Sequence, residues 1–167
     1  GIEGEGLKLA LDTLGKIRLA QIGARAVGKA TRILQLATDY ASRRSQFGQT
    51  IDQFQMIQQM LADSAIEINA ARLALLQTAW ESDQGREVRA RISMIKVQAS
   101  ETLGRIADRA VQIHGGLGYS RDLPIERYYR DARIYRIYDG TSEIHRTVIA
   151  RALSKGEENL YNLPLAS

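Results

Sequence analysis

Asp139 is the residue of this sequence best suited to proton transfer. It lies between Tyr138 and Gly140 in "RIYRIYDGTSEIHR" (residues 133–146), an arginine-rich stretch with an otherwise helical pattern. A carboxylate on such a turn can act as a general base when desolvation raises its pKa toward neutrality, and Gly140 leaves space beside it for a substrate. An aspartate before a helix is also a common N-cap, which accepts hydrogen bonds from free helix N–H groups. Taken alone, the residue fits a cap better than a base.

Two further motifs contain groups that can bind phosphate. "ASRRSQFGQTI" (residues 41–51) places Arg44 close to Phe47 at the end of a helical pattern, which suits a phosphate and an adjacent flat ring. A favourable positive charge at a helix C-terminus explains the arginine equally well. "HGGLGY" (residues 114–119) offers Gly115 and Gly116 for close approach by a ligand. These glycines close a helix rather than open one, so a C-cap and turn is the simpler interpretation.

These motifs are separated by long helical patterns, and no alternating run of strand length interrupts them. Apolar residues at spacings of three and four predict helices over residues 7–40, 52–82 and 88–113. Shorter helices are expected from Pro124 to about residue 133, and from Thr141 to about residue 155. The predicted fold is all-α: an antiparallel up-and-down four-helix bundle with short extra C-terminal helices.

The pattern also predicts how these helices are buried and capped. The stripe expected to be buried in the first helix is Leu7, Leu11, Leu14, Leu19, Ile22, Ala30, Ile33, Ala37 and Tyr40. The second helix is apolar on two faces, which predicts that it is buried between other helices. Thr50 or Asp52 is expected to cap it. Gly15, Gly23 and Gly28 are expected to allow close approach by a neighbouring helix or a ligand.

Composition excludes several classes of site. The 167 residues include no cysteine and two histidines, so no disulfide is possible and no metal site is expected. The apolar runs are too short to span a membrane, and "GIEGEG" at the start predicts a linker or domain edge rather than a signal peptide. The net charge of +4 is compatible with an anionic partner, although a solvated basic surface explains it as well.

The motifs together resemble a known family. "GEGLKLALDTLGKIR", "RSQFGQTI" and "ADRAVQIHGGLGYSRDLPIERYYRDARIYRIYDGTSEIHR" are similar, in order and spacing, to the C-terminal helical domain of the acyl-CoA dehydrogenases. The resemblance extends to about Gly156. It implies that residues 1–156 form this domain and that residues 157–167 form a loose tail. It also implies that the family's N-terminal helical domain and middle β-domain are absent from this chain.

The resemblance implies an FAD-dependent enzyme that dehydrogenates an acyl-CoA thioester between its α and β carbons. A homo-oligomer, dimer or tetramer, would pass electrons to an electron-transfer flavoprotein. The enzyme would be cytoplasmic in a bacterium, or mitochondrial or peroxisomal in a eukaryote, and not secreted. The isolated chain is expected to be inactive, because the sites for the flavin ring and the substrate also need the other two domains.

The resemblance also implies roles for individual residues. Asp139 falls on the position of the catalytic base, and Arg18 and Gly140 fall beside the substrate. The residues implied to contact FAD are Arg44, Phe47, Gln112, Gly115, Gly116, Thr141 and Glu143; Arg44 and Phe47 would hold the pyrophosphate and adenine side of a neighbouring subunit's FAD. His114 is expected to be structural, and Arg127, Arg130, Asp131 and Arg133 are expected to form ion pairs.

One departure from the family pattern is chemically important. Most relatives that use this base position carry "YEGTS", whereas this sequence reads "YDGTS". Asp139 is one methylene shorter than glutamate, and a misplacement on that scale can slow a reaction roughly 100-fold. A second branch of the family carries its glutamate at the position of Ile17, which offers no base here. The alternatives are a flavin oxidase or monooxygenase of the same fold, a DNA-binding member of the superfamily, and a non-catalytic helical scaffold. The basic residues are interleaved with acids rather than clustered on one face, which argues against nucleic-acid binding by this chain.

Overall fold

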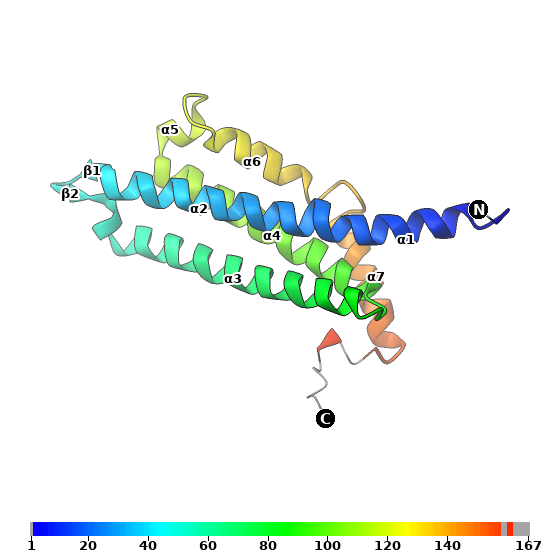
Figure 1. Cartoon of the computed structure of the whole chain (residues 1–167). Coiled ribbons are helices and arrows are strands. Elements are labelled where there is room, and N and C mark those ends of the chain that lie inside the picture. The colour runs from blue at the N-terminus through cyan, green and yellow to red at the C-terminus, as the bar shows by residue number, and fades with distance from the viewer. Residues whose placement is uncertain (1, 158–159, 162–167) are drawn as a thin grey trace.

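The computed structural model describes residues 2–157, 160 and 161. A near-continuous first helix comprises α1 (Gly6–Arg18), a π-helical segment (Leu19–Ala24) and α2 (Arg25–Arg43). The long helices α3 (Gln55–Asp83) and α4 (Arg89–His114) follow, and then the shorter α5 (Gly116–Tyr119), α6 (Ile125–Ile134) and α7 (Ser142–Ser154). In Figure 1, α2, α3 and α4 run side by side, α6 lies along the bundle, and α7 packs at its end against α4. The predicted all-α bundle is confirmed.

Helix α4 is the centre of the core. Its predicted stripe is buried throughout, from Val88 and Ile92 to Leu103, Ile106 and Ile113. Helices α2, α3, α6 and α7 all pack against α4, so most of its circumference is covered. Ser93, Lys96 and Ser100 of α4 are buried as well. This helix therefore supplies buried polar groups that can belong to a site.

The predicted burial was wrong on two helices. Leu7 and Leu14 are 73% and 40% exposed, because α1 projects beyond the end of the bundle, where no described residue covers them. The second apolar face of α3 is also uncovered: Ile66, Leu73, Leu76 and Trp80 are each more than half exposed. Within this chain α3 is therefore buried on one face only.

A short hairpin replaces the simple helix ending expected after residue 44. Strand β1 (Ser45–Gln46) pairs antiparallel with β2 (Gln49–Thr50), and Phe47 and Gly48 form the two-residue turn with φ of 52° and 83°. Two successive positive φ angles match the twist of a hairpin, and glycine second in the turn was the available sequence signal. A 3-10 turn (Ile51–Gln53) follows, and the residue that precedes α3 is Phe54.

The predicted cap of the second helix was therefore wrong. The hydroxyl of Thr50 donates to the carboxylate of Asp52 at 2.5 Å, and neither the 3-10 turn nor α3 has a side-chain hydrogen bond at its N-cap. Of the three glycines, Gly23 alone packs closely within the chain: a Cβ there would lie 2.8 Å from both Ile95 and Leu75. Gly15 and Gly28 face open space.

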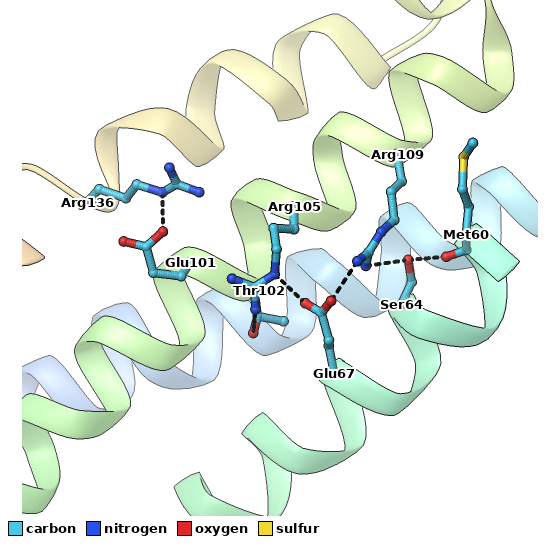
Figure 2. Close-up of polar contacts among 8 residues, drawn as sticks. All are labelled: Met60, Ser64, Glu67, Glu101, Thr102, Arg105, Arg109 and Arg136. Atoms are coloured by element: carbon cyan, nitrogen blue, oxygen red, sulfur yellow. Dashed lines mark hydrogen bonds and ion pairs between the residues drawn. The ribbon is translucent and has the colours of Figure 1, made fainter.

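Helices α3 and α4 are joined by a carboxylate shared between two arginines. Figure 2 shows Glu67 of α3 between Arg105 and Arg109 of α4, with N···O distances of 2.8 and 2.7 Å. The same view shows Arg136 reaching Glu101 of α4 at 3.1 Å. These ion pairs fix the rotation of α4 against its neighbours, which the apolar stripe alone does not.

The C-terminal helices begin and end close to the predicted residues. Pro124 precedes α6, and Thr141 caps α7 by accepting a hydrogen bond from the N–H of Ile144 at 3.4 Å. Of the expected ion pairs, Arg130 binds Glu126 and Asp131 binds Lys29. Leu160 is buried beside Ala90 and Ala152, whereas residues 158–159 and 162–167 of the expected loose tail lie outside the described residues. In the part of the chain that is described, no helix combines the length and apolar character needed to cross a membrane.

Candidate functional site

A groove of about 950 Å³ lies where the hairpin meets the C-terminal end of α4. Five of the predicted residues line it: Arg44, Phe47, Gln112, Gly115 and Gly116. Arg44 is exposed, and among the described side chains none forms an ion pair with its guanidinium. The groove therefore combines a free cation, an aromatic ring and exposed backbone.

Phe47 is held in a strained position at the tip of the hairpin. Its φ of 52° is unusual for a bulky residue, and its side chain is 94% exposed. The ring meets Phe54 edge to face, with centroids 6.3 Å apart. Backbone strain of this kind persists where the surrounding structure enforces it and is common at ligand sites. An exposed, strained aromatic residue beside a free arginine is typical of a site for a flat ring attached to a phosphate.

The glycine pair forms the opposite wall of the groove. Gly115 ends α4 with φ 59° and ψ −138°, so its φ is positive as predicted, although its ψ lies outside the left-handed helical region. A Cβ at Gly115 or Gly116 would meet nothing within 4 Å, so both glycines border open space in the groove. Their Cα groups are thus accessible to a ligand, whereas the N–H of Gly115 donates to the carbonyl of Gln112 at 3.2 Å.

His114 supports this wall from behind, as expected of a structural residue. Its ring stacks on Tyr40 at 4.3 Å, and its Nδ1 lies 2.7 Å from the carbonyl of Ala110. The carbonyl can only accept, so Nδ1 carries the proton. Burial lowers the pKa of His114, so the ring is neutral at neutral pH.

The other predicted residues meet at a second place, which we call the Asp139 corner: Arg18, Asp139, Gly140, Thr141 and Glu143. Asp139 and Gly140 form a left-handed turn with φ of 54° and 90° between α6 and α7. Asp139 is exposed, and it does not cap α7, because Thr141 occupies the N-cap. The cap was the simpler interpretation of the sequence, and the structure gives that role to its neighbour.

The start of α7 arranges the polar groups of the corner. Hydrogen bonds from its own backbone N–H and from the Thr141 hydroxyl hold the pKa of Glu143 below its usual range. On the other side of the turn, burial and, second, the neighbouring Tyr135 together raise the pKa of Tyr138 to about 12. Tyr138 is therefore a neutral phenol, and Glu143 is a carboxylate at neutral pH.

Sequence reasoning missed three polar residues that complete the corner. Lys96 and Ser93 of α4 are 1% and 4% exposed, and His145 of α7 is 5% exposed. In the described part of the chain, neither the Lys96 ammonium nor Nε of Arg18 has a hydrogen-bond partner. Burial lowers the pKa of Lys96, while the charges of Glu143 and Asp139 oppose this shift. The available signal was a lysine on the otherwise apolar face of a central helix.

The groove and the Asp139 corner lie near opposite ends of α4. Ser93 belongs to the corner and His114 to the groove, and at a rise of about 1.5 Å per residue this part of the helix spans about 30 Å. The structure thus brings the predicted residues together as two separate groups. Arg44, Phe47, Gln112, Gly115 and Gly116 form one group, and Arg18, Asp139, Gly140, Thr141 and Glu143 form the other.

The fold and the site define an all-α helical bundle with a phosphate-compatible groove and an acidic turn. Comparison with known proteins identifies the family. Residues 4–154 match the model of the acyl-CoA dehydrogenase C-terminal domain. The chain is 43% identical over 155 residues to acryloyl-CoA reductase (NADH) of Anaerotignum propionicum, covering 93% of this chain and 39% of that protein. The chain therefore belongs to the acyl-CoA dehydrogenase family and corresponds to its C-terminal domain.

Solved structures give the same assignment. Butyryl-CoA dehydrogenase from Megasphaera elsdenii matches with a TM-score of 0.89 and 38% identity, covering 92% of this chain and 40% of that chain. A structure of PigA with FAD and proline matches with a TM-score of 0.88 and 32% identity, again covering 92% and 40%. This chain thus spans about two-fifths of the length of these relatives.

Proposed function

We propose that this chain is the C-terminal domain of an FAD-dependent acyl-CoA dehydrogenase, with Asp139 as the base. The observation that carries the proposal is the left-handed turn at Asp139, an exposed acid held beside three buried polar residues of α4 and α7. Membership of the family supports the same role. Asp139 would take the α-proton of the thioester, and a hydride would leave the β-carbon as the double bond forms. FAD, when bound, supplies the acceptor for the two electrons.

The residues of the groove fit the adenosine diphosphate part of FAD. The free guanidinium of Arg44 can bind a phosphate through two parallel hydrogen bonds, and the exposed ring of Phe47 can stack on adenine. The open space in front of Gly115 and Gly116 allows a ligand to approach the backbone closely. Gln112 can donate and accept hydrogen bonds at the same wall. At the other end of α4, Thr141 and Glu143 would lie near the flavin.

A homo-oligomer, dimer or tetramer, is part of this proposal for two reasons. The groove lies about 30 Å along α4 from Asp139, so a groove would serve the Asp139 corner of a neighbouring copy. The uncovered apolar face of α3, with Ile66, Leu73, Leu76 and Trp80, also needs a partner. The reduced enzyme would pass its electrons to an electron-transfer flavoprotein, in the cytoplasm of a bacterium or in mitochondria or peroxisomes of a eukaryote.

The test uses the full-length enzyme from which this domain comes. The flavin absorbance is followed under anaerobic conditions while butyryl-CoA, octanoyl-CoA, isobutyryl-CoA and cyclohexanecarbonyl-CoA are added in turn. We expect at least one of them to bleach the flavin, and Asp139→Asn to slow the bleaching at least about 100-fold while FAD remains bound. Asparagine also tolerates a left-handed backbone, so this variant changes the proton acceptor without forcing the turn to change.

Two results would overturn the proposal. One is bleaching at the wild-type rate by Asp139→Asn, which would remove this residue from catalysis. The other is rapid reoxidation in air with release of peroxide, which would make the enzyme an oxidase. The shorter acid favours a branched or cyclic substrate over a straight-chain one, and the four thioesters separate these classes directly.

A further inference from the structure

His145 connects the Asp139 turn to the central helix. Its Nε2 lies 3.1 Å from the main-chain carbonyl of Asp139, and its Nδ1 lies 3.1 Å from the hydroxyl of Ser93 on α4. Both His145 and Ser93 are at least nine-tenths buried. The imidazole therefore forms a direct polar bridge from the backbone of the proposed base to the most buried helix of the fold.

The chemistry of the two partners determines the tautomer of this ring. A carbonyl oxygen only accepts, so Nε2 carries a proton. In the neutral ring Nδ1 then accepts from the hydroxyl of Ser93. That hydroxyl also lies 3.2 Å from the carbonyl of Arg89, to which it can turn when Nδ1 is protonated. Burial lowers the pKa of His145, and the positive charges of Lys96 and Arg18 lower it further, against the opposing effects of the Asp139 carbonyl and carboxylate.

The turn is one that needs such support. Left-handed backbone is strained for a residue other than glycine, although aspartate is among those that tolerate it best. Asp139 has φ 54°, and a Cβ on Gly140 would lie 2.9 Å from His145 Nε2, so the ring lies directly against the turn. The backbone adds one closing hydrogen bond, from the N–H of Ser142 to the carbonyl of Arg136 at 3.0 Å. Strain is retained only where the surroundings enforce it.

We propose that His145 is a positioning residue for the base: it holds the carbonyl of Asp139 against Ser93 of α4 and so fixes the backbone from which the catalytic carboxylate extends. This inference rests on the proposed role of Asp139. A short aspartate tolerates little misplacement, because it has one side-chain bond fewer than glutamate with which to correct its position. A fixed backbone at Asp139 compensates for that shorter reach.

The test compares three variants of the full-length enzyme with FAD bound, by stopped-flow reduction of the flavin with the most active of the four thioesters. His145→Leu keeps the volume and loses both hydrogen bonds, and we expect reduction to be roughly 100-fold slower. His145→Gln can donate to the Asp139 carbonyl and accept from Ser93, and we expect it to stay within about 5-fold of wild type. Ser93→Ala removes the outer hydrogen bond alone, and we expect a loss of roughly 10-fold.

A second readout separates positioning from a general loss of structure. The dissociation constant of the thioester is obtained from the same stopped-flow experiments by varying its concentration. It should change less than about 3-fold in all three variants, because binding does not depend on the carboxylate position. Wild-type reduction rates in His145→Leu would overturn the inference, as would an equal loss in the Leu and Gln variants. If Asp139→Asn reduces flavin normally, the proposed function itself fails. If Asp139→Asn is inactive while His145→Leu is fast, only the positioning role fails.

Discussion

Two residues other than glycine have a positive φ in the described part of the chain, Phe47 and Asp139, and both were singled out from the sequence. Neither left-handed backbone was foreseen, because both depend on how a turn closes in three dimensions. Phe47 depends on the register of a two-residue hairpin, and Asp139 on the buried ring of His145. The types of these residues were informative from sequence alone, whereas their conformations required the neighbours that enforce them.

Burial makes two histidines, one at each of the two sites, sensitive to acid. Burial lowers the pKa of both His114 and His145 from the usual 6.5. Below pH 6.5 these histidines bind protons in the unfolded chain but not in the folded chain. The free energy of unfolding therefore decreases as the pH falls from 6.5 toward the lowered pKa values of the folded chain. Each histidine contributes at most about 1.4 kcal/mol per pH unit.

We therefore expect the urea midpoint of this chain to decrease between pH 7.5 and pH 5.5. His114→Phe keeps a ring against Tyr40 but cannot be protonated, so its urea midpoint should decrease less over the same range. A midpoint that is constant with pH in the wild type would contradict this reasoning. An identical decrease in the variant would assign the effect to groups other than His114.

The elements themselves were largely predictable, since α4 has the stripe and the length that the pattern indicated. The spacing of apolar residues does not show whether both apolar faces of a helix are covered by other helices. Helix α3 has two apolar faces in sequence, and this chain covers one of them. The polar contacts that orient α3 on α4 were also missed, because Glu67 and Arg109 are 42 residues apart and only the fold brings them together.

Glu67 provides a test of the ion pairs that join α3 to α4. Its side chain is 21% exposed and its carboxylate accepts from both Arg105 and Arg109 (Figure 2), so Glu67→Gln leaves two arginines without their shared anionic partner. We expect a loss of about 1 kcal/mol in the free energy of unfolding by urea. Glu126→Gln is the matched control, because its partner Arg130 is 70% exposed on the same helix, and a loss of only about 0.3 kcal/mol is expected. Equal losses in the two variants would show that the ion pairs between α3 and α4 stabilise the fold no more than an exposed pair within one helix.

For the whole molecule, the important feature is the separation of the groove from the Asp139 corner. The resemblance implied such a separation, because it assigned Arg44 and Phe47 to the FAD of a neighbouring subunit. The length of α4 separates them by about 30 Å. If each site combines the corner of one copy with the groove of another, two defective chains can complement one another.

A mixing experiment on the full-length enzyme measures this directly. Arg44→Glu damages the groove and Asp139→Asn damages the corner, so each protein alone should be inactive. When the two are unfolded, mixed in equal amounts and refolded with FAD, half of the random pairs contain both chains, and one of the two sites in each such pair is intact. We expect about a quarter of the wild-type flavin reduction to return. No recovery, with wild-type enzyme refolded in parallel as the control, would place groove and corner in the same copy's site.

The π-helical segment Leu19–Ala24 separates Arg18 from the rest of the first helix. Such a segment contains one residue more than the α-helix that would replace it. An extra residue inserted into an uninterrupted α-helix would rotate everything before it by about 100° around the axis. The π-helical segment takes up that residue within one wider turn, so α1 keeps its face toward the site and Arg18 stays at the Asp139 corner. The wider turn thus lets the first helix contain one residue more without turning Arg18 away from Asp139.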